Sequence, residues 1–139
     1  MTNAPEIRFH NPPTMPTATG YTQVVEARGG RTIYISGQVA LDKDGQLVGA
    51  GDVGAQAEQI FANLRAALAA TGATFAEVVK LTIFVLDIAS LPAVRQARDR
   101  YVNTDQPPAS SAVEVRRLFR DDVLLEIEAI AVTAERSAS

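Results

Sequence analysis

The C-terminal part of the chain contains the run Leu124-Leu125-Glu126-Ile127-Glu128-Ala129-Ile130-Ala131-Val132. Side chains of a β-strand alternate between its two faces, so this run predicts a strand with two different sides. One side is wholly apolar and consists of Leu125, Ile127, Ala129 and Ala131. The other side carries Glu126 and Glu128 among aliphatic residues. A carboxylate in such surroundings is costly unless it is paired, hydrogen-bonded or functional, so an ion-pair ladder and a functional site both fit this pattern.

The composition describes an ordinary globular chain. It has 139 residues, of which 47% are hydrophobic and 21% charged, and this suits one domain over residues 1–139. The net charge of −3 gives no general attraction to nucleic acids or anionic membranes. No apolar run approaches the roughly 18 residues that a membrane span needs. Without a basic and apolar leader and without cysteine, a cytoplasmic location is expected.

The missing residue types restrict the chemistry. The chain has no cysteine, and His10 is its single histidine. Zinc sites use several histidine or cysteine ligands at short spacing, and a Ser-His-Asp triad would depend on His10 alone. The sequence therefore disfavours a zinc enzyme and a Ser-His-Asp triad, and His10 is interpreted as a surface or packing residue.

The periodicity predicts a strand order of three strands, a helix, a strand, a helix and two strands. The first helix is expected between an N-cap at Asp52 and a stop at Gly72, and Thr74 to Glu77 resembles a capping box. Apart from one short strand, residues 1–17 are expected to be irregular, and residues 135–139 form a frayed tail. The expected strands are 6–11, 21–27, 31–38, 78–87, 110–118 and 124–133, and the second helix is 91–103.

This order predicts an α+β fold, a mixed sheet with both helices packed on one face. The last two strands are expected to form an antiparallel hairpin that places Arg116 opposite Glu126. The helices should cover the side formed by Val79, Leu81, Ile83 and Val85. The opposite side carries too much apolar surface for a monomer, which predicts a symmetric oligomer. Its apolar residues are Phe84, Leu86, Leu124, Ile130 and Val132.

Two further patterns point to no specific function. Residues 49–54 match G-x-G-x-x-G, but Asp52 would repel a phosphate there and the chain is too short for a dinucleotide-binding domain. The arginines of the second helix, at positions 95, 98 and 100, are interpreted as a solvated face. Those at 116, 117 and 120 are nearly cancelled by Asp121 and Asp122, so nucleic acid is a disfavoured partner.

Several short segments together resemble the RidA/YjgF family, over about residues 18–134. They are Gly20-Tyr21-Thr22-Gln23, Ile35-Ser36-Gly37-Gln38, Gln56 with Asn63, Val79-Lys80-Leu81-Thr82, Pro108-Ala109 before Val113-Glu114-Val115, and Glu126-Ile127-Glu128-Ala129-Ile130-Ala131. The resemblance implies a chorismate-mutase-like fold. It also implies a homotrimer whose sheets face a central barrel, with pockets for a small metabolite between subunits.

The resemblance also implies an activity. Family members of the deaminase type hydrolyse enamines and imines to ketoacids and ammonia, with no metal or cofactor. By position, Tyr21, Ser36 and Glu126 match pocket residues, and Gly37 contributes backbone near the ligand. Glu126 would activate the attacking water as a general acid and base, while Glu128 could be either functional or structural.

Three positions depart from the deaminase pattern. Ser110 stands where deaminases have the arginine that binds the substrate carboxylate, a contact worth about 1.5–3 kcal/mol. Ala112 stands where cysteine is frequent, and Arg95 where asparagine is common. Arg95 is our candidate for a relocated cation. These departures favour hydrolysis of an imine or enamine different from that of the main branch; the alternatives are a non-catalytic metabolite-binding trimer and, third, a ribonuclease.

Overall fold

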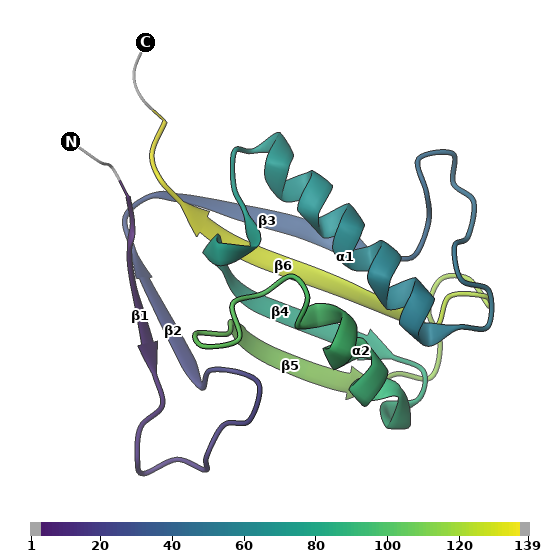
Figure 1. Ribbon diagram of the computed structural model, residues 1–139, viewed down its shortest axis with the longest axis horizontal. Helices are drawn as coiled ribbons and strands as arrows, with labels where there is room; N and C mark the ends of the chain where they lie inside the picture. Colours follow the sequence, from purple (N-terminus) through teal and green to yellow (C-terminus); the bar gives the residue numbers. More distant parts are fainter. Residues whose placement is uncertain (1–3, 137–139) are drawn as a thin grey trace.

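The computed structural model describes residues 4–136 and confirms the α+β class. A four-stranded sheet has the order β3-β6-β4-β5, and both helices lie on the same face of it (Figure 1). A separate two-stranded sheet, β1-β2, flanks it. The strands are β1 (Glu6–His10), β2 (Val24–Arg28), β3 (Arg31–Gln38), β4 (Val78–Val85), β5 (Ala109–Glu114) and β6 (Leu125–Thr133). The helices are α1 (Val53–Ala70) and α2 (Leu91–Arg98), and η1 (Phe75–Glu77) and η2 (Ile88–Ser90) are single 3₁₀ turns.

Strand β6 lies between β3 and β4 and runs antiparallel to both. Its predicted apolar side is confirmed, because Leu125, Ile127, Ala129 and Ala131 are all buried beneath the helices. The predicted hairpin of β5 and β6 is wrong. β5 instead pairs in parallel with β4, because α2 carries the chain back over the sheet as in a βαβ unit. Arg116 therefore does not lie across from Glu126.

Local irregularities separate the remaining predictions from the structure. An irregularity between Val78 and Lys80 of β4 makes Val78 a core residue and leaves Val79 only half-buried. Strand β2 pairs with β1, although a glycine turn joins it to β3. The chain passes from one sheet to the other at that turn. Glycine is needed there, because a side chain on Gly30 would collide with the carbonyl oxygen of Thr133.

Residues at the ends of the helices account for where the helices begin and stop. Asp52 accepts a hydrogen bond from the Ala55 amide at 3.0 Å, and Gly72 has a φ of +78°, as predicted for an N-cap and a C-terminal stop. The single turn at 75–77 and the bond from the Thr74 amide to the Glu77 carboxylate are also as predicted. Helix α2 ends at Arg98 rather than near Asn103, because the 3₁₀-type bonds from Arg100 to Ala97 and from Tyr101 to Arg98 interrupt the α-helical pattern.

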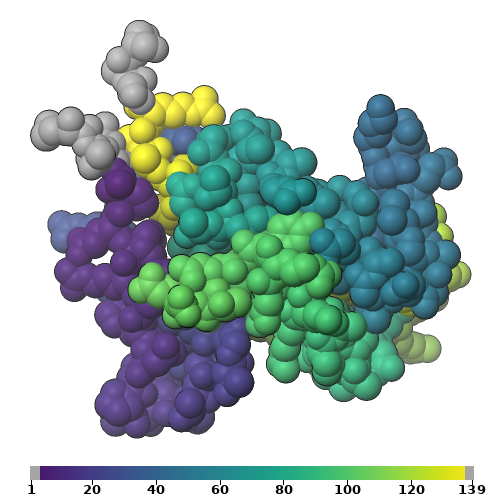
Figure 2. All heavy atoms as spheres, viewed as in Figure 1, coloured from purple at the N-terminus to yellow at the C-terminus, as the bar shows by residue number. Residues whose placement is uncertain are grey.

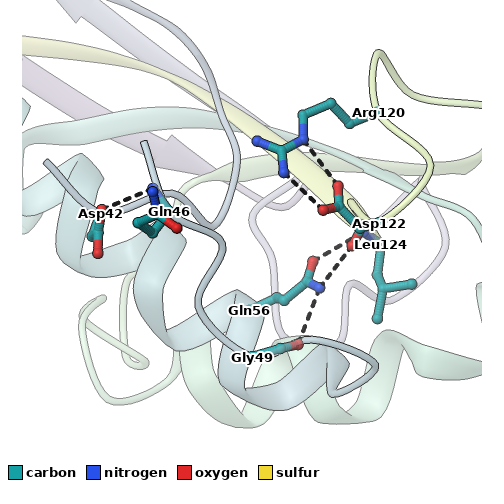
Figure 3. A network of polar contacts seen from close by, with 7 residues as sticks. All are labelled: Asp42, Gln46, Gly49, Gln56, Arg120, Asp122 and Leu124. Carbon is teal, nitrogen blue, oxygen red and sulfur yellow. Dashed lines mark hydrogen bonds and ion pairs between the residues drawn. The ribbon is translucent and has the colours of Figure 1, made fainter. Parts of the chain in front are cut away.

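Gln56 of α1 joins three separate parts of the backbone (Figure 3). Its amide nitrogen donates to the carbonyl oxygens of Gly49 and Asp122, both at 3.1 Å, and its amide oxygen accepts from the Leu124 amide at 2.9 Å. The side chain is fully buried. The G-x-G-x-x-G stretch is thus a loop held to α1 and to the start of β6, which agrees with its rejection as a nucleotide site.

The segment after α2 is attached to α1 by Tyr101. Its hydroxyl donates to Glu58 Oε1 at 2.8 Å, and its ring stacks on Phe61. Burial, followed by the Glu58 hydrogen bond, raises the pKa of Tyr101. Arg100 also pairs with Glu58, and this hydrogen bond lowers the pKa of the Glu58 carboxyl. Arg100 is therefore engaged in an ion pair with a residue of α1. Neither helix is long and apolar enough to cross a membrane within residues 4–136.

Replacing Gln56 by leucine is expected to destabilise the fold by about 2–5 kcal/mol, because three backbone groups lose their hydrogen bonds to this buried side chain. Chemical denaturation measures this difference. Gln59→Leu is the matched control, since Gln59 lies on the same helix and its amide nitrogen bonds only the Asn63 side chain. Equal stability of the two variants would contradict the role given to Gln56.

Candidate functional site

A cavity of about 200 Å³ lies between α2, β5 and the segment that precedes β2. The register pairs Leu81 with Ser110 and Ile83 with Ala112, so both β5 residues face the helices. Four of the residues singled out from the sequence are brought together in this cavity. Its lining is Thr19, Tyr21, Ile83, Leu91, Arg95, Arg98, Ser110 and Ala112.

The wall that carries Tyr21 is fixed to the start of β5. The buried Thr22 donates from its amide to the Pro108 carbonyl oxygen at 3.2 Å and from its hydroxyl to the Pro107 carbonyl oxygen at 2.5 Å. In Figure 2 the loop that leads into β5 lies against the N-terminal segment, as these bonds require. The Tyr21 hydroxyl accepts a long contact of 3.4 Å from the Gln23 amide nitrogen. Tyr21 is thereby placed at the cavity by a segment distant from it in sequence.

A second group of predicted residues gathers on the other face of the sheet. The register between β3 and β6 shifts between Ile35 and Gln38, so Ser36 and Gly37 form a bulge. A Cβ atom on Gly37 would lie 2.6 Å from the carboxyl carbon of Glu126. Only glycine fits there without displacing the carboxylate, which gives a physical reason for the glycine in the Ser-Gly-Gln segment.

The structure does not bring these two groups together within one chain. Glu126 pairs with Phe84 of β4 and projects from the face opposite the helices. Ser110 and Ala112 project from the helix-covered face. A sheet separates the two faces, so one copy of the chain holds two candidate half-sites that point in opposite directions.

The outer face of the sheet is apolar with a few charges. Tyr34 is 77% exposed and Val113 is 43% exposed, and a shallow hollow of about 270 Å³ is lined by Tyr34, Ser36, Lys80, Thr82, Glu128 and Ile130, among others. Lys80 donates to the Ser111 hydroxyl at 2.9 Å. Phe84 and Ile130 are only partly buried, as expected for this face, but Val132 is already buried within the chain. Leu86 and Leu124 were also predicted here, but they line a hollow with Val53 of α1 and Ser90 of η2, and Leu124 packs against the core.

Arg98 is the cavity residue that the sequence analysis missed. It was interpreted as part of a solvated face, yet its side chain is only 7% exposed. The available signal was its spacing of three residues from Arg95, which places both side chains on one side of a helix. Arg95 itself is exposed and lines the cavity, as the relocated-cation hypothesis requires.

No metal centre is evident in the described part of the chain. Residues 4–136 contain no group of three or more histidine, cysteine, aspartate or glutamate side chains placed to hold an ion. His10 lies on β1 and contacts Glu26 Oε1 at 3.0 Å. It is a surface residue away from both half-sites.

Comparisons with known proteins place this geometry in context. The family model described as Endoribonuclease L-PSP matches residues 13–133. The chain is 42% identical to protein DfrA of Myxococcus xanthus over 119 residues, covering 85% of this chain and 89% of that protein. It is 32% identical to the 2-iminobutanoate/2-iminopropanoate deaminase of Dermatophagoides farinae over 126 residues, covering 90% and 95%. The crystal structure of the Rid family protein YyfB from Yersinia pestis superposes with a TM-score of 0.83 at 38% identity, covering 91% and 98%.

Gly37→Ala is expected to displace the Glu126 carboxylate by about 1 Å or more, since ordinary contact distances cannot be met otherwise. A crystal structure of the variant measures the displacement. Gly54→Ala is the control, because a Cβ there meets its nearest atom at 3.5 Å in an ordinary helical position. An unmoved Glu126 in the Gly37→Ala structure would contradict the proposed close packing.

Proposed function

Because the chain belongs to the endoribonuclease L-PSP family, which is the RidA/YjgF family, we propose that it hydrolyses an imine or enamine in pockets between the subunits of a homotrimer. The products are a carbonyl compound and ammonia. A deaminase of 2-iminobutanoate and 2-iminopropanoate is among its relatives, which supports this class of reaction.

The observation that carries the proposal is the division of the site between two faces. The half-site with Ser36, Gly37 and Glu126 lies on the exposed outer face, and the cavity with Tyr21 and Ser110 lies beneath α2. A second copy that presents its outer face to this cavity completes the site. Repeating that contact around a threefold axis closes a ring and buries the apolar outer face of each copy.

Glu126 is the group we assign to proton transfer. Its carboxylate accepts no hydrogen bond from another residue within 4–136, and the side chain is half-buried beside Gly37, so the carboxylate is available to a water molecule. The carboxylate takes a proton from water as the oxygen attacks the imine carbon, and it returns that proton to the nitrogen. The carboxylate then moves the proton of the new hydroxyl group to the nitrogen as well, so that the carbon–nitrogen bond breaks, ammonia leaves and a carbonyl group forms. Tyr21 and Ser36 supply hydrogen bonds to the reacting atoms.

We expect a substrate different from that of the main branch, because Ser110 replaces the arginine that binds the substrate carboxylate at β5 in deaminases. A hydroxyl carries no charge and cannot bind a carboxylate through two parallel bonds, as a guanidinium does. Ala112 leaves further space beside it in the cavity wall. The substrate therefore does not place a carboxylate against β5.

A non-catalytic metabolite-binding trimer is the second candidate, and the loss of a fixed cation at position 110 favours it. It would use the same cavity but would not need the Glu126 carboxylate. The ribonuclease alternative has less support, because Arg117 and Arg120 form ion pairs with Asp121 and Asp122.

Glu126→Gln is expected to lower the rate of imine hydrolysis by about 10²–10⁴-fold, because the amide cannot exchange the proton. The measurement is ammonia release above the spontaneous rate from imines generated by an amino-acid oxidase. Glu128→Gln is the matched control, since it removes the next outward carboxylate of the same strand. If Glu126→Gln keeps full activity, the hydrolytic proposal is wrong. If neither wild type nor Ser110→Arg releases ammonia, the binding protein is favoured.

Ser110→Arg is expected to raise kcat/KM for 2-iminobutanoate at least about tenfold, because it adds a charge-assisted contact to the carboxylate. Ketoacid release at limiting substrate measures this change. Ser110→Gln adds similar bulk without the charge and should show no gain. Equal behaviour of the two variants would mean that a cation at this position does not reach the substrate.

A further inference from the structure

Arg98 is a buried cation that pairs with Asp99 but uses only part of its hydrogen-bonding groups. Its Nε and Nη2 donate to one oxygen of Asp99, at 3.0 and 2.8 Å. Its Nη1 donates to no acceptor within residues 4–136, where no fully buried side-chain nitrogen lacks a partner. Nη1 therefore keeps access to open space, and Arg98 lines two cavities, the one with Ser110 among them. Burial of a guanidinium without a complete set of acceptors is costly, so its position needs a reason.

The surroundings of Arg98 hold it in place. A Cβ on Gly20 would lie 3.1 Å from Arg98 Nη2, and Gly20 has a φ of +79°. Glycine thus lets the backbone before Tyr21 pass directly over the guanidinium. Thr22 fixes this segment to the residues before β5. Arg98 is consequently enclosed between α2 and a segment that is itself anchored.

Arg95 adds a second guanidinium to the same cavity. It precedes Arg98 by three residues on α2, so both side chains lie on one side of the helix. It makes no ion pair within the described residues, and no acidic side chain lines the cavity. The nearby acceptor is Asp99, which leaves two guanidinium groups against one carboxylate. This wall of the cavity carries a net positive charge.

We propose that Arg95 and Arg98 form an anion subsite on α2, and that the ligand is a small organic carboxylate whose charged group lies against α2 instead of β5. This inference rests on the proposed function and names its substrate class. Arg98 supplies the free Nη1–H in a fixed position, and Arg95 closes on the carboxylate from the rim with charge-assisted bonds. The opposite wall, with Ser110 and Ala112, then accommodates the uncharged part of the ligand.

Binding of 2-oxobutanoate and its neutral isostere 2-oxobutanamide to the intact protein tests this inference, by calorimetry or NMR titration. Wild type should bind the anion at least tenfold more tightly than the amide. Arg95→Gln should remove most of this preference, and it changes an exposed residue, so folding is retained. Arg98→Lys keeps the charge but loses the fixed N–H groups, and it should weaken anion binding at least fivefold. Arg100→Gln is the matched control, because Arg100 pairs with Glu58 outside the cavity, and should stay within twofold of wild type.

The inference is overturned if wild type binds neither compound, or binds both equally. It is also overturned if Arg95→Gln and Arg98→Lys bind the anion as wild type does, or if Arg100→Gln loses as much affinity as they do. Its failure is distinguishable from failure of the proposed function. Anion binding without imine hydrolysis would support the subsite and reject the enzyme. Hydrolysis that depends on Glu126 but ignores Arg95 and substrate charge would support the enzyme and reject the subsite.

Discussion

The rest of the structure depends on the placement of β6 between β3 and β4. Its apolar side is buried under both helices, and a slip of one residue would turn Glu126 and Glu128 into that core. The register is therefore strongly determined by the cost of burying two carboxylates. Because side chains alternate along a strand, the same constraint directs Glu126 away from the helices and away from the cavity beneath α2. Core packing and the division of the candidate site thus have one cause.

This division links assembly to function in the proposed trimer. A monomer leaves both half-sites incomplete and the apolar outer face exposed. One contact between copies resolves both conditions, so the interface energy and the construction of the site come from the same surface. The bulge at Ser36 and Gly37 contributes to this arrangement, because it brings backbone directly against the Glu126 carboxylate at the edge of that surface.

Local patterns in the sequence predicted the local structure well. The alternation in β6, the Asp52 cap and the Gly72 stop all appear in the structure. Strand pairing was less predictable, because the β5 partner is set by the α2 crossover and not by proximity in sequence. Val78 lies in the core instead of Val79 because the pairing of β4 is irregular between Val78 and Lys80. A strict alternation of side chains cannot predict such an irregularity. The burial of Arg98 depends on Gly20, a contact between distant segments that a helical pattern alone does not reveal.

The arginine pair on α2 changes what the serine at position 110 means. The loss of a cation from β5 suggests a site without anion recognition, but the cavity as a whole keeps a net positive wall. Arg98 is already desolvated and partly neutralised by Asp99 before any ligand arrives, so little ordering remains to be done when its free N–H meets an oxyanion. Arg95 is exposed and must lose rotamer freedom on binding. In this arrangement Arg98 contributes mainly geometry and Arg95 mainly charge, which divides between two residues of a helix what one arginine of a strand would supply.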